Sequence, residues 1–315
     1  MTLSTRVTRL LGIEHPIIQG GMAWTATAEL SAAVSNAGGI GVIGAGHMPT
    51  DLLREQIALA KSLTDRPFGV NLMLLTPHID DIVQMVVDER VPMVTTGAGN
   101  PGKYMGALKD AGIKVIPIVP SVALARRMES IGADAIIGEG MEAGGHIGEL
   151  TTMVLIPQLV DAVDVPVIAA GGIADGRGVA AAFALGAEGV QLGTRFMCAM
   201  ECTIHPSVKE QVLKAKDRDT VVTGRSTGNP VRVLKNKLAR QIMELDRENR
   251  VEEIETLGAG KLALAMREGD IEMGSLMAGQ SAAMVSCIEP AADIVNELVR
   301  DAEAVMRALV ASRDA

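Results

Sequence analysis

A histidine surrounded by glycines is the feature of this sequence with the clearest chemical potential. It stands in the segment EGMEAGGHIGE (139–149), directly after an apolar run, in a chain with only five histidines. An imidazole titrates near neutral pH and can therefore donate or accept a proton during catalysis. Glu139 and Glu142 are close enough in sequence to orient the ring or to tune its pKa. We predict that His146 is catalytic or contacts the substrate, although a lone histidine is more often structural.

Two later glycine-rich segments indicate a site for a phosphate group. AAGGIADGRG covers residues 169–178, and QLGTRF covers residues 191–196. Glycine lets the backbone approach a ligand closely, and backbone N–H groups at helix N-termini, here with the Thr194 hydroxyl, bind phosphate. The alternative is that both segments only turn the chain.

Polar residues at other predicted strand ends could hydrogen-bond a flat heterocycle near that phosphate. They are Asn71, Thr95, Thr96 and Gln191. His47, which follows a pair of strand-end glycines, could line the same rim. Any one of these residues could instead do no more than cap the end of a strand.

The elements that must position these residues are short apolar runs, each followed by an amphipathic, Ala- and Leu-rich stretch. Eight such runs predict buried parallel strands covered by helices, and the count of eight favours a closed (β/α)8 barrel. In such barrels the loops at the carboxyl ends of the strands carry the chemistry. The predicted strands are 16–22, 39–46, 67–74, 92–99, 114–120, 135–142, 166–173 and 189–196.

The length of 315 residues leaves room for more than the barrel. We expect an α/β fold with the (β/α)8 barrel in residues 1–200 and a small, mainly helical second domain in residues 201–270. Residues 271–315 are expected to form a closing segment and a C-terminal helix that returns to the barrel.

Composition and charge exclude several classes of function. A net charge of −9 argues against nucleic acid as the main partner, because phosphate binding needs a basic surface. No apolar stretch is long enough to cross a membrane and the N-terminus lacks the pattern of a signal peptide, so we expect a cytoplasmic protein. Its three cysteines predict free thiols, and no metal site is expected.

Taken together, the glycine-rich motifs resemble a known family. The chain resembles the FMN-dependent barrel family that contains nitronate monooxygenases and enoyl-acyl carrier protein reductases. The resemblance covers nearly the whole chain, and the motifs follow one another in the same order. The motifs EGMEAGGHIG and KAKDRDTVVTGRSTGNPVR, with KYM after TTGAGNP, most closely resemble the reductase branch. The resemblance rests on IIQGGMAW, PFGVNLML, TTGAGNP, EGMEAGGHIGELTTM, VPVIAAGGIADGRG, QLGTRF and GSLMAGQ.

This resemblance implies that FMN lies across the strand ends. Its phosphate would be held by Gly171, Gly172, Gly193 and Thr194. The flavin would be lined by Met22, Ala23, Asn71, Thr95, Gly97, Glu139, Gly145, Gln191, Met277, Ala278, Gly279 and Gln280. For Met277, Ala278, Gly279 and Gln280, the match to the family rests on one short stretch of sequence.

The resemblance also implies a reaction and its partners. NADH or NADPH would be the co-substrate, and a trans-2-enoyl thioester on acyl carrier protein would be reduced, the last step of fatty-acid elongation. His146 would donate a proton or hydrogen-bond the thioester carbonyl, and the sequence does not separate these roles. A homodimer is usual for such barrels. The main alternative is a nitronate monooxygenase, which oxidises alkyl nitronates with oxygen.

One charged segment could receive the acidic carrier protein. Residues 209–240 hold nine basic and three acidic residues, a local charge of +6 in an acidic chain. Such a patch could steer an acidic partner toward the enzyme. The alternative is a solvated helix face with ion pairs.

Two further functions are weaker alternatives for the whole protein. A nucleotide dehydrogenase would need a cysteine on a rim loop, and none precedes Cys198. A flavin-storage protein would need no histidine at the rim.

Overall fold

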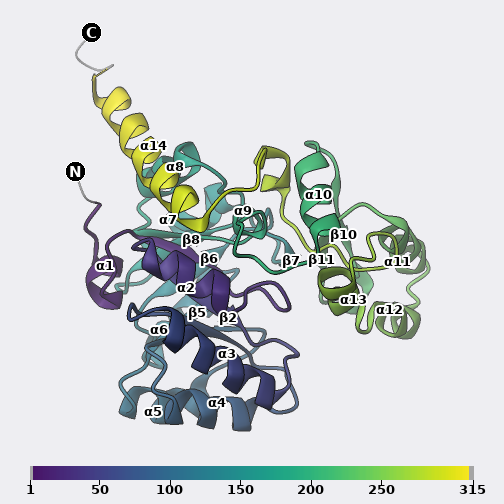
Figure 1. Ribbon diagram of the computed structural model, residues 1–315, viewed down its shortest axis with the longest axis horizontal. Helices are drawn as coiled ribbons and strands as arrows, with labels where there is room; N and C mark the ends of the chain where they lie inside the picture. The colour runs from purple at the N-terminus through teal and green to yellow at the C-terminus, as the bar shows by residue number, and fades with distance from the viewer. Residues whose placement is uncertain (1–2, 312–315) are drawn as a thin grey trace.

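A closed parallel barrel forms the larger part of the molecule (Figure 1). The computed structural model describes residues 3–311. The predicted (β/α)8 barrel is confirmed, since each of the eight predicted strands contains one strand of the barrel. In their order around the barrel these are β1 (Ile17–Gln19), β2 (Ile40–Gly44), β3 (Gly69–Met73), β4 (Met93–Gly97), β5 (Lys114–Val119), β6 (Ile136–Glu139), β8 (Val167–Ala170) and β9 (Gly189–Leu192).

The barrel closes by pairing β1 with β9, where Ile18 lies beside Gln191. Branched apolar side chains such as Ile40, Ile137 and Ile168 are fully buried and fill the interior, as in other eight-stranded barrels. The first helix contributes Val7 to the same cluster. The interior is therefore a packed core and not a channel.

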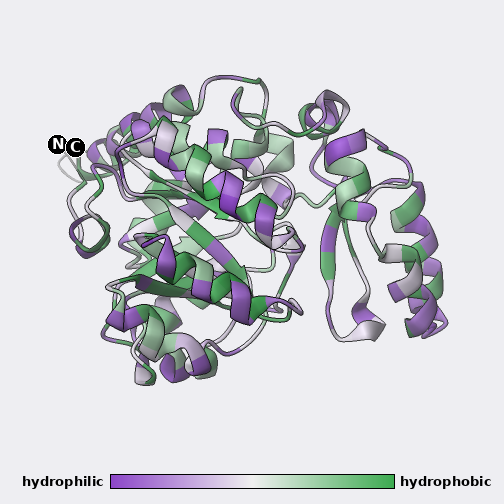
Figure 2. Cartoon of the chain, turned by 60° about the horizontal axis from the view of Figure 1, so that its bottom comes forward, coloured by the Kyte–Doolittle hydropathy of each residue, from purple (hydrophilic) through white to green (hydrophobic). Residues whose placement is uncertain are grey.

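Helices cover the outside of the barrel, and in Figure 2 hydrophobic strands lie within a ring of helices that carry hydrophilic residues. The long C-terminal helix packs against α8. These helices are α1 (Arg6–Leu11), α2 (Ala28–Asn36), α3 (Thr50–Leu63), α4 (Ile79–Asp88), α5 (Gly102–Asp110), α6 (Val122–Ser130), α7 (Thr152–Val160), α8 (Gly176–Ala184), α9 (Thr194–Met197) and α14 (Ala291–Ala311).

A second, smaller unit lies beside the barrel (Figures 1 and 2). It has a hydrophobic cluster of its own, formed by Leu238, Ile242 and Ile254. Besides helices it contains a β-hairpin, which the sequence patterns did not predict. Its elements are α10 (Pro206–Lys214), β10 (Thr220–Thr223), the 3-10 turn η1 (Arg225–Thr227), β11 (Val231–Leu234), α11 (Lys237–Arg247), α12 (Val251–Gly258) and α13 (Lys261–Glu268).

The hairpin connects the two units. A two-residue strand, β7 (Gly145–His146), leaves the loop after β6 and completes a three-stranded sheet in the order β10-β11-β7. The segment before α14, which includes the 3-10 turn η2 (Gln280–Met284), runs along the same sheet, because Val233 bridges to Met277. The predicted catalytic histidine therefore lies where barrel and second unit meet.

The cysteines are free thiols, as predicted. Cys198 and Cys202 are buried, and burial raises the pKa of the Cys198 thiol to about 11. Within residues 3–311 no cluster of three or more histidine, cysteine or acidic side chains is arranged to hold a metal ion. None of the helices described in that range is both long enough and apolar enough to cross a membrane.

Candidate active site

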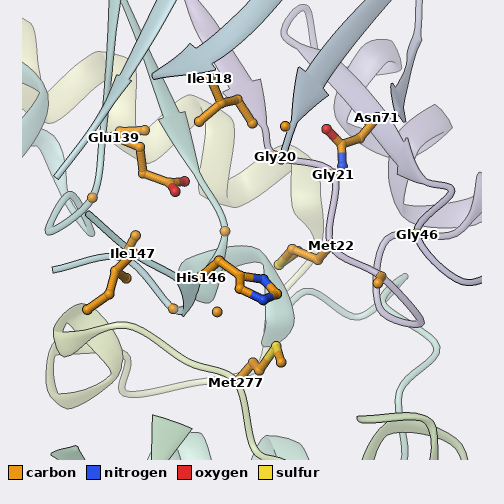
Figure 3. Close-up of a pocket in the computed structure, with 18 of the residues that line it drawn as sticks. Gly20, Gly21, Met22, Gly46, Asn71, Ile118, Glu139, His146, Ile147 and Met277 are labelled. Carbon is orange, nitrogen blue, oxygen red and sulfur yellow. The ribbon is translucent and has the colours of Figure 1, made fainter. Parts of the chain in front are cut away.

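A cavity of about 720 Å³ opens at the carboxyl ends of the barrel strands (Figure 3). Its walls come from the ends of β1, β3, β4, β5, β6, β8 and β9, from the loop after β2, and from β7. The second unit adds the hairpin turn at residues 228–230 and side chains of α13. The position agrees with the expectation that the chemistry of a barrel lies at this face.

Most of the predicted site residues line this one cavity. They are Met22, Ala23, Asn71, Gly97, Glu139, Gly145, His146, Gly171, Gly172, Gln191, Gly193, Thr194 and Met277. The four others lie behind the walls: Thr95, Ala278, Gly279 and Gln280.

Two of those four residues bond to lining residues, and a third bonds to the loop after β6. The hydroxyl of Thr95, which is fully buried, donates a hydrogen bond of 2.8 Å to Oδ1 of Asn71. The backbone N–H of Gly279 donates to Oγ1 of Thr194 at 2.9 Å. The N–H of Gln280 donates to the carbonyl of Glu142 at 2.9 Å. Thr95 and the 278–280 segment therefore support the cavity wall from outside.

His146 lies at the mouth of the cavity. The ring points into the same space as the side chains of Met22 and Met277 in Figure 3. Partial burial lowers the pKa of His146 below its usual 6.5, and the nearby charge of His47 lowers it further. The imidazole is therefore mostly neutral at pH 7, a state in which one ring nitrogen donates a hydrogen bond and the other accepts one.

The expectation that Glu142 orients His146 is wrong. The Glu142 carboxylate instead accepts hydrogen bonds from the backbone N–H and the hydroxyl of Thr152, each at 3.0 Å. It therefore holds the start of α7 against the loop after β6, because the first N–H groups of a helix need acceptors. Glu142 is close to His146 in sequence, but in the folded chain its carboxylate binds the first residue of α7.

Glu139 differs from Glu142 because its carboxyl group faces the cavity (Figure 3). Burial raises the pKa of this carboxyl group to about 7, since a charge is unfavourable in a poorly solvated position. A substantial fraction of Glu139 is therefore protonated at neutral pH. It can donate a hydrogen bond to a ligand as well as accept one.

The ends of β8 and β9 form a cradle that leaves room for a ligand. Gly171 and Gly172 have positive φ angles of 95° and 73°, which glycine adopts without strain. A Cβ atom at Gly171 would lie 2.8 Å from the carbonyl oxygen of Gly140. Oε1 of Gln191 is buried beside this cradle and has no hydrogen-bond partner within the described chain. An unpaired buried acceptor is costly, so it fits a ligand that brings a donor.

Further lining residues lie in glycine-rich segments that the sequence indicated only as motifs, without giving each residue a role. Gly20, Gly21 and Gly46 let strand ends approach closely, and a Cβ atom at Gly21 would lie 2.3 Å from Cβ of Asn71. The turn at residues 228–230 was noted in a basic segment and in a motif that resembles the reductase branch, but not as part of the cavity wall, although its Gly-Asn-Pro sequence is typical of a turn. His47, by contrast, lines the rim as suggested.

Comparison with known proteins places this site in a family. The family model described as nitronate monooxygenase matches residues 4–86 and 77–301. The chain belongs to the nitronate monooxygenase family. Its resemblance to the flavin-barrel motifs is thereby confirmed, and the solved structure of FabK from Thermotoga maritima is 53% identical with a TM-score of 0.96, over 98% of this chain and 99% of that one.

Nitronate monooxygenase family relatives carry different names. A probable nitronate monooxygenase from Staphylococcus saprophyticus is 37% identical over 354 aligned residues, covering 97% of this chain and 99% of the relative. A carboxyl-CoA dehydrogenase from Rhodococcus jostii, named for a hydroxylated methyl-oxo-octahydroindene substrate, is 41% identical over 241 residues, covering 76% of this chain and 68% of the relative. Family membership therefore indicates an oxidoreductase without deciding its substrate.

Proposed function

We propose that this protein is an FMN-dependent enoyl-acyl carrier protein reductase that uses NADH or NADPH. The likeness to FabK from Thermotoga maritima, nearly full-length at 53% identity, is the observation that carries the proposal. The cavity supports it, because glycine-rich strand ends, a neutral histidine and apolar walls meet there. The motifs around His146 and the hairpin turn favour the same branch of the family.

The cavity walls suit FMN. Gly171, Gly172, Gly193 and Thr194 would hold its phosphate, and the unpaired Oε1 of Gln191 would accept a hydrogen bond from a donor such as a ribityl hydroxyl or a flavin N–H. FMN, when bound, supplies two-electron hydride chemistry between a nicotinamide and an enoyl thioester. Addition of FMN to the flavin-free protein is expected to quench flavin fluorescence at a ratio of one to one.

The residues of the chain would orient the thioester and stabilise the negative charge that develops on it, while a solvent-derived proton would complete saturation at the α-carbon. The neutral imidazole of His146 can donate its N–H to the thioester carbonyl, on which negative charge develops as the β-carbon is reduced. Its lowered pKa favours this role over that of a proton donor, because little imidazolium is present at neutral pH. The protonated fraction of Glu139 gives the same cavity a second hydrogen-bond donor.

Apolar walls would receive the acyl chain. The side chains of Ile118, Leu124 and Ile147 line the cavity from the barrel, and Leu262 and Met266 line it from α13. Burial of methylene groups contributes about 0.8 kcal/mol each. A longer enoyl chain should therefore bind more tightly until these walls are covered.

Turnover with simple thioesters tests the proposal directly. The purified protein, loaded with FMN, should oxidise NADH or NADPH in proportion to added crotonyl thioester, and the product should be the saturated thioester. Rapid mixing with NADH or NADPH in the absence of oxygen should bleach the flavin absorbance before any thioester is added. A flavin that stays oxidised with both nicotinamides would reject the reductase.

Nitronate monooxygenase remains the second candidate, because the family model and the Staphylococcus relatives carry that name. In that reaction His146 would act as a base on an alkyl nitronate, for which a neutral imidazole is also suitable. Oxygen uptake with an alkyl nitronate and without nicotinamide, in the absence of thioester turnover, would favour this candidate.

A further inference from the structure

The backbone of His146 is fixed by a strand of the second unit. In β7, His146 pairs with Val231 and Gly145 pairs with Arg232, both antiparallel. The next residue continues the contact, since the N–H of Ile147 donates to the carbonyl of Pro230 at 3.1 Å. The direction of the imidazole therefore depends on where β11 lies.

The turn that leads into β11 is anchored from outside the hairpin by one carboxylate. Asp246 of α11 accepts hydrogen bonds from the backbone N–H groups of Arg225 and Ser226, at 3.0 and 2.9 Å, and from the Ser226 hydroxyl at 2.6 Å. Partial burial acts in the opposite direction, but these hydrogen bonds lower the pKa of Asp246, so it is charged at neutral pH. The anchored turn continues into residues 228–230, which line the cavity.

A buried arginine forms a second tie between β11 and the histidine loop. Arg232 is only 4% exposed. Its Nε donates to the carbonyl of Met141, in the loop before β7, at 3.0 Å. Its Nη1 donates to Oγ1 of Thr220 in β10 at 3.1 Å. One guanidinium group thus joins the loop that carries His146 to both strands of the hairpin.

We propose that Asp246 and Arg232 are positioning residues, which hold the β10–β11 hairpin and, through it, the imidazole of His146 over the cavity. Neither residue lines the cavity, so neither acts on a ligand directly. The inference rests on the proposed function for what His146 does there, whereas the placement of the ring does not depend on the reaction. A displacement of about 1 Å in an active site costs roughly 100-fold in rate, so partial loosening should cost about tenfold.

The test compares two aspartates of the second unit in the full-length, FMN-loaded protein. Asp246→Ala releases the hairpin turn. Asp270→Ala is the matched control, because Asp270 accepts from the N–H groups of Glu272 and Met273, at 2.9 and 2.8 Å, which lie outside the hairpin. Three readouts are needed: amide exchange at Ile147, titration of the His146 ring by NMR, and kcat and KM with crotonyl thioester.

The Asp246→Ala variant is expected to exchange the Ile147 amide faster and to lower kcat about tenfold, with less change in KM. The pKa of His146 should rise toward 6.5, because the ring becomes less enclosed. His47, whose charge also lowers this pKa, lies on the loop after β2, and Glu139 lies on β6, so both should remain in place. The control should leave all three readouts unchanged, and a His146→Gln spectrum assigns the ring signal.

A second variant tests the guanidinium tie. Arg232→Lys, which keeps one donor, should recover part of the activity that Arg232→Met loses, and if the methionine variant does not fold, Asp246→Ala decides. Unchanged exchange at Ile147 and an unchanged His146 titration in Asp246→Ala would overturn the proposal. If the protein reduces no enoyl thioester, these two structural readouts still judge the positioning role, while the proposed function alone is rejected.

Discussion

Among the side chains that line the cavity, His146 and Glu139 have pKa values that the protein shifts in opposite directions. Burial lowers the pKa of His146 and raises that of Glu139 to about 7. Both shifts favour the uncharged form, because a poorly solvated cavity disfavours charge. A site with neutral donors suits a substrate that gains negative charge only during the reaction, such as a thioester carbonyl.

The first prediction concerns the histidine. His146→Ala should retain FMN with unchanged affinity, because the ring lies at the cavity mouth and the phosphate cradle lies at β8 and β9. Removal of one hydrogen-bond donor to a developing oxyanion costs roughly 100-fold or more in kcat. The measurement is steady-state turnover of crotonyl thioester, together with a flavin spectrum of each preparation. Full turnover in the variant would exclude the role given to His146.

The second prediction concerns the stability of the flavin-free protein against pH. A carboxyl group with a pKa of 4.5 when unfolded and about 7 when folded binds more protons in the folded state between these values. Glu139 therefore destabilises the fold progressively as the pH rises from about 4.5 to 7, by at most about 3 kcal/mol, because the side chain is only half-buried. The free energy of unfolding of Glu139→Gln, measured with urea, should therefore increase relative to that of the natural protein as the pH rises over this range. Parallel curves for the two proteins would show that the shift is absent.

At the scale of elements, local patterns predicted the strands, whereas a contact distant in sequence completed the site. The apolar runs and their glycine ends predicted all eight barrel strands, because each has a local cause in side-chain burial and turn geometry. Strand β7 has two residues and pairs with β11 far along the chain, so no local periodicity could indicate it. Glu142 likewise lies close to His146 in sequence, but folding brings it to Thr152.

The third prediction tests the turn after β8. Gly171→Ala would place a Cβ atom 2.8 Å from the Gly140 carbonyl oxygen, in a backbone with φ of +95°. The turn must shift, so we expect FMN to bind at least about tenfold more weakly, since a loss of about 1.4 kcal/mol is tenfold in affinity. Fluorescence titration measures the change. Gly106→Ala in α5 is the matched control, because its Cβ would meet no atom within 4 Å, and equal losses in both variants would contradict the prediction.

At the scale of the whole molecule, the basic segment 209–240 is less exposed than its sequence suggests. Lys209 and Arg232 are buried: the former donates to the carbonyl of Ala199 at 2.6 Å, and the latter supports the histidine loop. Both were counted toward a docking surface for acyl carrier protein, and both must be removed from it. Sequence alone could not separate them from the solvent-exposed cations, because burial of a charge is decided by partners elsewhere in the chain.

The last prediction concerns the cations of that segment that remain exposed. Lys235 and Lys237 lie on the surface of the second unit, at the start of α11. If they steer an acidic carrier protein, the double change to Glu should raise KM for the carrier-bound enoyl substrate several-fold at low salt and leave KM for the coenzyme A thioester unchanged. Reversal of Arg126 and Arg127 on α6 changes the net charge equally and serves as the control. Because general repulsion of an acidic partner would appear in both double variants, only a loss confined to the Lys235 and Lys237 pair supports docking at this surface.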